Sequence, residues 1–349
     1  MAAPTALYDL HHDVRSGQLT VPTDLDLLVV LSGHMDAGRL ARQMRVALVD
    51  HLRSQRVATF RTDELVDYRA RRPRVSFDTR RFHDLTLPSI ALDLQHDLLG
   101  HPFLLLAGPE PDFRWEGFTA AVLELAEDLE VRGLVFADAV PMPVPHTRRL
   151  GVTAHGTRAE VLEGLTTWSV EAELMAGASQ MIEVRAEERG LPTAGYSLHI
   201  PHYVADARYP QGAVAAMEYA GAAMGRMLPT DELRDAVRDV EAELERQTSS
   251  SPEIQTMVEG LERNFDQNSG DQERSLLETS SGLPDGDELA SAVEAYLQER
   301  VTRSDADTPD DATGWSQGAA GSDTSPDDDA EPNSPAQDAD RRDSDTDTP

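Results

Sequence analysis

The segment LLVVLSGHMDAGRLARQMRVAL, residues 27–48, decides the fold that we predict for this chain. Residues 27–31 are five consecutive apolar residues, too few for a helix and typical of a strand buried on both faces. The turn at 32–38 carries two glycines and an aspartate. From Leu40 onward, apolar residues recur every three or four positions, which indicates an amphipathic helix. The segment is therefore a strand-turn-helix unit of the kind that builds a parallel sheet.

The same alternation of strand and helix patterns continues to residue 228. Two runs, residues 75–77 and 90–94, are interpreted as a pair of strands on an edge or flap. Further patterns predict strands at 57–60, 103–107, 134–137, 151–154 and 192–200, and helices at 118–129, 175–189 and 211–228. Buried strands separated by helices predict an α/β fold, in which a mostly parallel sheet is flanked by helices on both faces.

Composition divides the chain into four parts. We expect an N-terminal extension over residues 1–25, the α/β domain over 26–229, a helical extension over 230–303 and an acidic tail over 304–349. The helical extension ends in an amphipathic stretch at 287–301, which either packs on its own domain or binds a partner groove. The tail holds 14 acidic residues, two arginines and one large apolar residue. Such a segment cannot offset its ordering entropy, so we predict a disordered acidic tail.

Charge and missing residue types exclude several functions. The 349 residues carry 63 acidic and 31 basic side chains, a net charge of -32, and every base is an arginine. Without cysteine or lysine the chain has no disulfide, no thiolate ligand and no lysine nucleophile. The negative charge argues against binding to nucleic acid or anionic membrane. There is no run of 18 apolar residues and no signal peptide pattern, so we expect a cytoplasmic protein.

Candidate ligand-binding residues lie in turns that follow the predicted strands, because ligands collect at the carboxyl ends of parallel strands. Gly33, Asp36 and Gly38 form the first turn, whose backbone N–H groups can hold an anion, although Asp36 also suits a helix cap. The next turn contains Glu110 and Asp112. These are either an acid/base pair or, with Asp112, the capped start of a helix.

A third turn combines stiffness with polar side chains. Pro145 precedes His146, Thr147 and Arg148, and proline fixes the backbone at the entry. The turn is either an oxyanion or phosphate site or a rigid structural or interfacial element. In the second case we expect Arg148 to cap carbonyl groups or to pair with a carboxylate across a subunit boundary.

The fourth turn contains His202, three residues after His199, and Tyr203. Two histidines at this spacing can ligate a metal only if a carboxylate joins them, and on a strand they face different ways. The run at residues 11–13, two histidines and an aspartate, is a still weaker candidate. No serine lies in a nucleophile elbow. The sequence therefore predicts no catalytic residue, no metal site and no cofactor.

Several motifs occur in an order that is similar to one protein family. They are SGHMDAG at 32–38, PHTR at 145–148 followed by VTAH at 152–155, GAS at 177–179, PHY at 201–203 and YP at 209–210. With the acidic extension, the chain resembles the actinobacterial branch of the proteasome assembly chaperone 2 family. The resemblance implies a phosphorylase/hydrolase-like fold. One departure is the C-terminus TDTP, which lacks the hydrophobic-tyrosine-any tripeptide of some archaeal relatives.

Two functional hypotheses follow from these observations. The first is a non-enzymatic binding protein that engages proteasome subunits or a related protein assembly as a homo-oligomer, a trimer or larger, as the resemblance implies. The second is a hydrolase or nucleosidase that uses a phosphorylase-like cleft. A nucleophile-base pair in one pocket distinguishes the second from the first.

Overall fold

The structure of the protein is a computed structural model, and it describes residues 7–165 and 173–268. The predicted helix at 287–301 and the predicted acidic tail at 304–349 lie outside the described residues.

One large sheet organises the described part of the chain. Its eight strands stand in the spatial order β1 (Tyr8–Leu10), β3 (Arg53–Phe60), β6 (Ala91–His96), β7 (Pro102–Pro109), β2 (Asp26–Ser32), β8 (Gly133–Met142), β10 (Thr193–Pro201) and β9 (Val152–Gly156). The four central neighbours β7, β2, β8 and β10 run parallel to one another. All other neighbouring pairs are antiparallel.

The α/β class is confirmed, and the sheet is mixed, with its parallel part confined to the centre. A short connection explains one antiparallel pair, because residues 97–101 between β6 and β7 are too few for the crossover that parallel strands require. β1 lies in the part of the chain expected to be an N-terminal extension, yet it forms the edge of the sheet beside β3.

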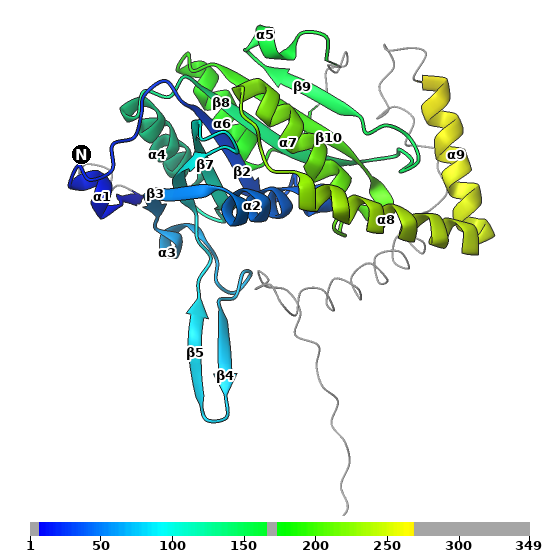
Figure 1. Cartoon of the computed structure of the whole chain (residues 1–349), viewed down its shortest axis with the longest axis horizontal. Coiled ribbons are helices and arrows are strands. Elements are labelled where there is room, and N and C mark those ends of the chain that lie inside the picture. The colour runs from blue at the N-terminus through cyan, green and yellow to red at the C-terminus, as the bar shows by residue number, and fades with distance from the viewer. Residues whose placement is uncertain (1–6, 166–172, 269–349) are drawn as a thin grey trace, which may run out of the picture. The chain divides into compact units, whose positions relative to one another are not determined.

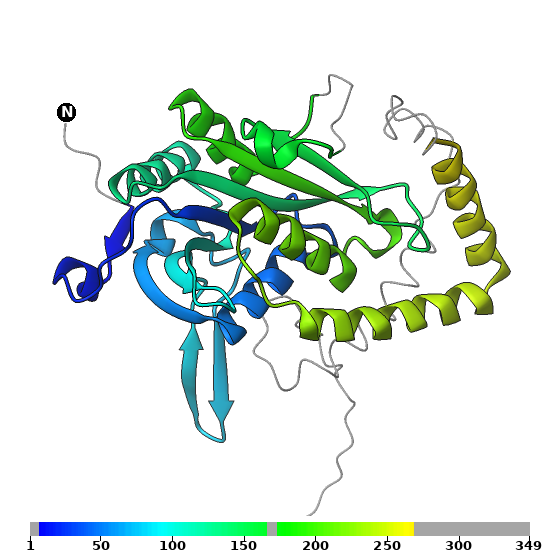
Figure 2. The ribbon, with the colours of Figure 1, turned by 45° about the horizontal axis from the view of Figure 1, so that its top comes forward.

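Helices cover both faces of the sheet (Figures 1 and 2). Leu28 and Val30 of β2 face one core cluster, while Leu27 and Val29 face the other. The first cluster packs against α2 (Leu40–His51), α7 (Pro210–Met224), α8 (Asp231–Ser250) and α9 (Pro252–Asn268), and the second against α4 (Trp115–Asp128) and α6 (Ala178–Glu188).

The remaining described helices are short: α1 (His12–Arg15), α3 (Thr62–Leu65), α5 (Ala159–Leu162) and the 3-10 helices η1 (Ala37–Arg39) and η2 (His202–Val204). None of the described helices combines the length and the apolar character needed to cross a membrane.

The prediction that residues 75–77 pair with residues 90–94 is wrong. β4 (Arg74–Asp78) pairs instead with β5 (Arg81–Thr86), and residues 90–94 contribute to β6, which lies between β3 and β7. The β4–β5 hairpin, which we call the arm, extends away from the large sheet (Figure 1). The alternation in β5 was missed because a bulge interrupts the pairing opposite residues 74–76, and Asp84 at this irregularity has a φ of 52°.

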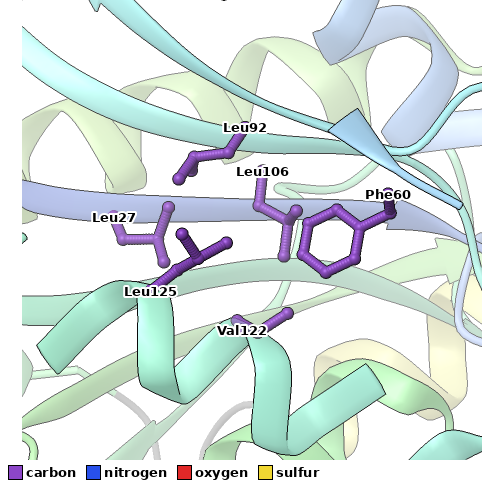
Figure 3. Close-up of a pocket in the computed structure, with 6 residues that line it drawn as sticks. All are labelled: Leu27, Phe60, Leu92, Leu106, Val122 and Leu125. Atoms are coloured by element: carbon purple, nitrogen blue, oxygen red, sulfur yellow. The ribbon is translucent and has the colours of Figure 1, made fainter. Parts of the chain in front are cut away.

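A small apolar cavity lies between the sheet and α4 (Figure 3). It contains no polar side chain that could orient a ligand, and we therefore regard it as a gap in the packing. The residues that line it are Leu27, Phe60, Leu92, Leu106, Val122 and Leu125.

Candidate functional site

The structure brings the four predicted turns together at one edge of the sheet. They follow the carboxyl ends of β2, β7, β8 and β10, which are consecutive neighbours. We call the turns at 33–38 and 145–148, together with residues 202–209, the carboxyl edge. The candidate residues of the sequence analysis therefore lie where an α/β sheet offers a binding site.

His146 is held by Tyr203, so two predicted site residues are partners of each other. The backbone N–H of His146 donates to Tyr203 Oη at 2.7 Å, and the Tyr203 hydroxyl lies 2.7 Å from His146 Nδ1. Because Oη accepts the first bond, its proton is available for Nδ1. Burial lowers the pKa of His146, which favours the neutral ring that this bond requires. Pro145 is buried beside them.

Thr147 and Arg148 tie the same turn to α9. The Thr147 hydroxyl donates to Glu262. The Arg148 guanidinium donates two bonds to the carboxylate of Asp266, both 2.8 Å long, and one of 2.9 Å to Glu262. The hydrogen bond to Asp266 raises the pKa of Arg148. The predicted carboxylate partner therefore exists, but it belongs to the same chain and not to a second subunit.

The first turn has a structural explanation. Asp36 Oδ1 accepts the backbone N–H of Ala41, in the first turn of α2, at 2.7 Å. Burial raises the pKa of Asp36 to about 7. Gly38 has a φ of 68°, and a Cβ there would lie 2.9 Å from Tyr209 Cβ, so only glycine fits. Its carbonyl accepts the N–H of Tyr209 at 3.0 Å, which joins this turn to the segment after Tyr203.

The two acids of the second turn serve different elements. Glu110 Oε2 accepts the N–H of Ala178 at the start of α6, at 3.0 Å, and a Cβ on Gly33 would lie 2.6 Å from the same oxygen. Asp112 does not cap α4 as expected. Its carboxylate accepts the N–H of Asp67 at 2.7 Å and pairs with Arg71, which fixes the base of the arm.

The predicted histidine pair does not converge. His199 Nε2 lies 2.8 Å from Thr153 Oγ1, and burial lowers the pKa of His199 to about 4. Burial also lowers the pKa of His202, whose Nδ1 is buried without a hydrogen-bond partner. Among residues 7–165 and 173–268, one group of potential metal ligands lies within 4.8 Å, at residues 11–13. Its members already pair with one another, so the group gives no independent sign of a metal.

A buried polar cluster that the sequence analysis missed lies on β8, β9, β10 and α6. His155 Nδ1 is 2.7 Å from Glu183 Oε1, and His155 Nε2 is 3.3 Å from Ser197 Oγ. Burial lowers the pKa of His155, but the hydrogen bond to Glu183 and neighbouring acids raise it further, so the net shift is upward. The order serine, histidine and carboxylate is that of a nucleophile activated by a base.

Asp138 extends this cluster beside Ser197, its register partner on β10. Gln180 Nε2 donates to Asp138 Oδ2 at 2.6 Å, and burial raises the pKa of Asp138 to about 6. Asp138 Oδ1 has no hydrogen-bond partner. The one available sign in the sequence was the alternation on β10, where positions 195, 197 and 199 carry glycine, serine and histidine between apolar residues.

Comparison with known proteins places this chain among proteins of the same fold. Residues 30–248 match the model of the PAC2 family. A protein of unknown function from Corynebacterium glutamicum is 32% identical, with a TM-score of 0.72 over 76% of this chain and 98% of its own. A Mycobacterium tuberculosis protein of unknown function is 34% identical, with a TM-score of 0.71 over 77% and 92%. The search of curated proteins finds no match.

A third structure, of a Mycobacterium tuberculosis proteasome-assembly chaperone homologue, is 20% identical, with a TM-score of 0.61 over 67% of this chain and all of its own. At that identity it shows a shared fold. The match to the family model covers the parallel centre of the sheet and nearly all of α8, and the two closer structures cover about three quarters of the chain. This chain therefore belongs to the PAC2 family.

Proposed function

We propose that this chain is a non-enzymatic binding protein that works on protein assemblies, with proteasome subunits as its partners, and that it functions as a homo-oligomer of three or more copies. Family membership and the fold shared with a proteasome-assembly chaperone homologue support the chaperone-like role. The observation that carries the proposal is the amphipathic arm. A cytoplasmic location remains a prediction.

The two faces of the arm differ in chemistry. Phe77 pairs directly with Phe82, and their ring centroids are 5.0 Å apart. Val75 lies on the same face as Phe77, because side chains alternate along a strand, and Leu85 lies in the irregular part of β5 between the pairs Arg74–Thr86 and Ser76–His83. These side chains are 45%, 61%, 71% and 64% exposed, for Val75, Phe77, Phe82 and Leu85. The other face carries Arg74, Ser76, Asp78, Arg81, His83 and Thr86.

The exposed apolar face of the arm has the properties of a surface that binds a partner. An isolated two-stranded hairpin is marginally stable in water, and a compact exposed apolar patch marks an interaction site. Aromatic residues and arginine are also the residues most enriched in protein interfaces. The base of the arm is fixed to the domain through Arg71 and Asp112, so the arm is presented in a defined place. These features support a role in which the chain binds another protein surface.

Binding to purified, unassembled proteasome α and β subunits of the source organism tests the partner. The full chain and a control variant, Leu174→Ser combined with Met175→Ser, are immobilised separately, and the subunits are passed over each. The control variant lacks two exposed apolar side chains that lie outside the arm. We expect saturable binding by both proteins. A correctly folded full chain that binds neither type of subunit would contradict the proteasome as partner.

A second candidate function, hydrolysis, is favoured by one observation, the arrangement of Ser197, His155 and Glu183. Two features place it second. Ser197 is paired on both sides within the sheet, with Asp138 and Thr153, so the strand offers no free backbone N–H for an oxyanion. The buried Asp138 carboxyl next to the hydroxyl would repel the negative charge that develops on an acyl intermediate.

A fluorophosphonate probe separates the two functions, because it labels a serine only when a base activates it. We expect no labelling of Ser197 in the folded full chain, with Ser197→Ala as the matched control. Labelling that requires Ser197 and is lost in His155→Gln, in a variant that stays folded, would establish the hydrolase and contradict the non-enzymatic proposal.

A further inference from the structure

A small apolar cluster at the carboxyl edge lies under the end of α9. Val140 and Met142 of β8 and Val144 after it are buried, and they form a cluster apart from the two large core clusters. We call these three residues the edge cluster. In the described part of the chain, the partly buried apolar side chains that pack against it are Met35 and Phe265. One aromatic side chain of α9 is therefore a main part of its cover.

Ion pairs hold Phe265 in this position. Arg148 pairs with Glu262 at 2.9 Å and with Asp266 at 2.8 Å, on either side of Phe265 in the sequence. The Arg148, Glu262 and Asp266 side chains are 33%, 25% and 54% exposed. Ion pairs that are this accessible to water contribute little to stability, and salt weakens them further. We call residues 262–268 the tip of α9. The tip is thus held by one aromatic contact and by weak ion pairs.

The preceding part of α9 is anchored more firmly than its tip. Ile254, Val258 and Leu261 are buried in the first core cluster, which also contains residues of α8. Gly260 lies at the junction of the two parts, and a Cβ there would meet no atom within 4 Å, so close packing does not require glycine. Glycine in the interior of a helix lowers its stability. The helix is therefore weakened just before the tip, where a separation would leave the anchored part in place.

We propose that the edge cluster and Arg148 form a protein-binding surface that the tip covers in the free chain, and that a partner segment of the same chemistry displaces the tip. The tip defines that chemistry, since Glu262, Phe265 and Asp266 place an aromatic ring between two carboxylates on a helix. The partner is accordingly an acidic amphipathic helix with an aromatic residue. Its ring would cover the edge cluster, and its carboxylates would pair with Arg148.

Two observations favour a partner that replaces the tip. The match to the family model ends at residue 248, so it includes the edge cluster and excludes α9, its cover. Arg149, next to Arg148, is exposed and makes no ion pair with any residue in the ranges 7–165 and 173–268. A more acidic partner segment can use this second guanidinium group, which the tip leaves unused. The inference concerns a surface distinct from the arm and does not rest on the proteasome as partner.

Amide hydrogen exchange in the full wild-type chain tests whether the tip opens separately. The tip amides should exchange about tenfold faster in 1 M salt than in low salt, because salt weakens the pairs with Arg148. Arg148→Ala should give the fast rate in low salt, and Gly260→Ala should slow it. Exchange in residues 231–250 should stay the same throughout. Tip exchange that neither salt nor Arg148→Ala changes would overturn the proposal.

A fluorescent peptide with the sequence of residues 258–268 tests the surface itself. The open variant combines Glu262→Gln, Phe265→Ser and Asp266→Asn in the full chain, which removes the contacts of the tip and keeps the surface. We expect the peptide to bind this variant at least about tenfold more tightly than wild type, because the tethered tip no longer competes. Adding Arg148→Ala to the open variant should reverse this gain.

The matched control is Glu259→Gln, which removes an exposed acid from the same helix and should leave peptide binding as in wild type. Phe265→Ser in the peptide should abolish its binding to the open variant. Equal peptide affinity of wild type and open variant, or no binding by a folded open variant, would overturn the proposal. Either result would leave the proposed function standing, because no proteasome subunit takes part in the experiment.

Discussion

The carboxyl edge and the arm differ in whether their aromatic and basic side chains have partners within the same chain. At the carboxyl edge, His146 is bonded to Tyr203, and Arg148 pairs with Asp266 and Glu262 of α9. On the arm, Phe77 and Phe82 are mostly exposed, and Arg80 and Arg81 at its tip make no ion pair with a carboxylate among residues 7–165 and 173–268. Both regions combine aromatic, basic and turn residues, so composition alone does not separate them.

This contrast shows which side chains are available for an interface in a protein of this kind. A polar or aromatic group that already has a partner in its own chain contributes to folding, and its removal lowers stability. A group that is presented on a fixed element without a partner contributes little to folding and is available to another molecule. By this criterion, Arg148 stabilises the fold, and the arm is available to bind another molecule.

Removing the arm should give the largest effect. Replacement of residues 74–86 by a short glycine-serine linker should convert the oligomer to single chains. The thermal midpoint of the remaining domain, measured on the monomer at high dilution, should match that of diluted wild type, because the arm contributes no side chain to either large core cluster. Light scattering and calorimetry measure the two quantities. A large fall in the midpoint at equal dilution would show that the arm is part of the fold.

Asp36→Asn should have the next largest effect, and its sign depends on pH. The pKa of Asp36 is about 7 in the folded chain against 3.8 ordinarily, so its contribution to stability is complete below about pH 4 and is lost as the pH rises through 7. Asparagine keeps the acceptor for Ala41 and removes the ionisation. The variant should therefore gain about 2–4 kcal/mol over wild type at pH 8 and much less at pH 5. Urea unfolding at both pH values measures this, and an equal change at both would contradict the buried carboxyl.

Tyr203→Phe should lower stability by about 1–3 kcal/mol, because it leaves the backbone N–H and the ring nitrogen of His146 without their partner. The oligomer mass should not change, since both residues act within one chain. Denaturant unfolding with parallel light scattering checks the two expectations. Dissociation at unchanged stability would place the carboxyl edge in the interface and reverse the comparison with the arm.

Arg148→Ala should have the smallest effect, a modest fall in the thermal midpoint that 1 M salt largely abolishes, because the ion pairs with Asp266 and Glu262 are partly exposed. Arg148→Lys should recover only part of the loss, since lysine cannot donate two parallel bonds to one carboxylate. Thermal scans at two salt concentrations measure both variants. A loss of the oligomer in Arg148→Ala would show that this arginine serves a neighbouring subunit after all.

Residues 27–48 were sufficient to predict the strand and helix that begin the parallel centre of the sheet, because a buried strand and an amphipathic helix each have a strong local pattern. The short β1 was missed, since three residues carry no period. The β5 strand was missed because its bulge sets Phe82 and Leu85 three positions apart, which breaks the alternation of a strand. Both errors concern single short strands and leave the predicted centre of the sheet unchanged.

The candidate site was likewise predicted only in part. The four turns after β2, β7, β8 and β10 were correctly placed at one edge, because strand ends and turn residues are visible in the sequence. The cluster of His155, Glu183 and Ser197 was not found, since its members are 28 and 42 positions apart and meet only through the sheet order. Contacts across such separations depend on topology, which no local motif encodes.

The mass of the full chain in solution is the sharpest test of the proposed homo-oligomer, in which another copy covers the exposed apolar face of the arm. Light scattering across micromolar concentrations should give an integral multiple of 38.2 kDa, three or more, that decreases on dilution and in high salt. A constant mass of 38.2 kDa at every concentration and salt condition would contradict it.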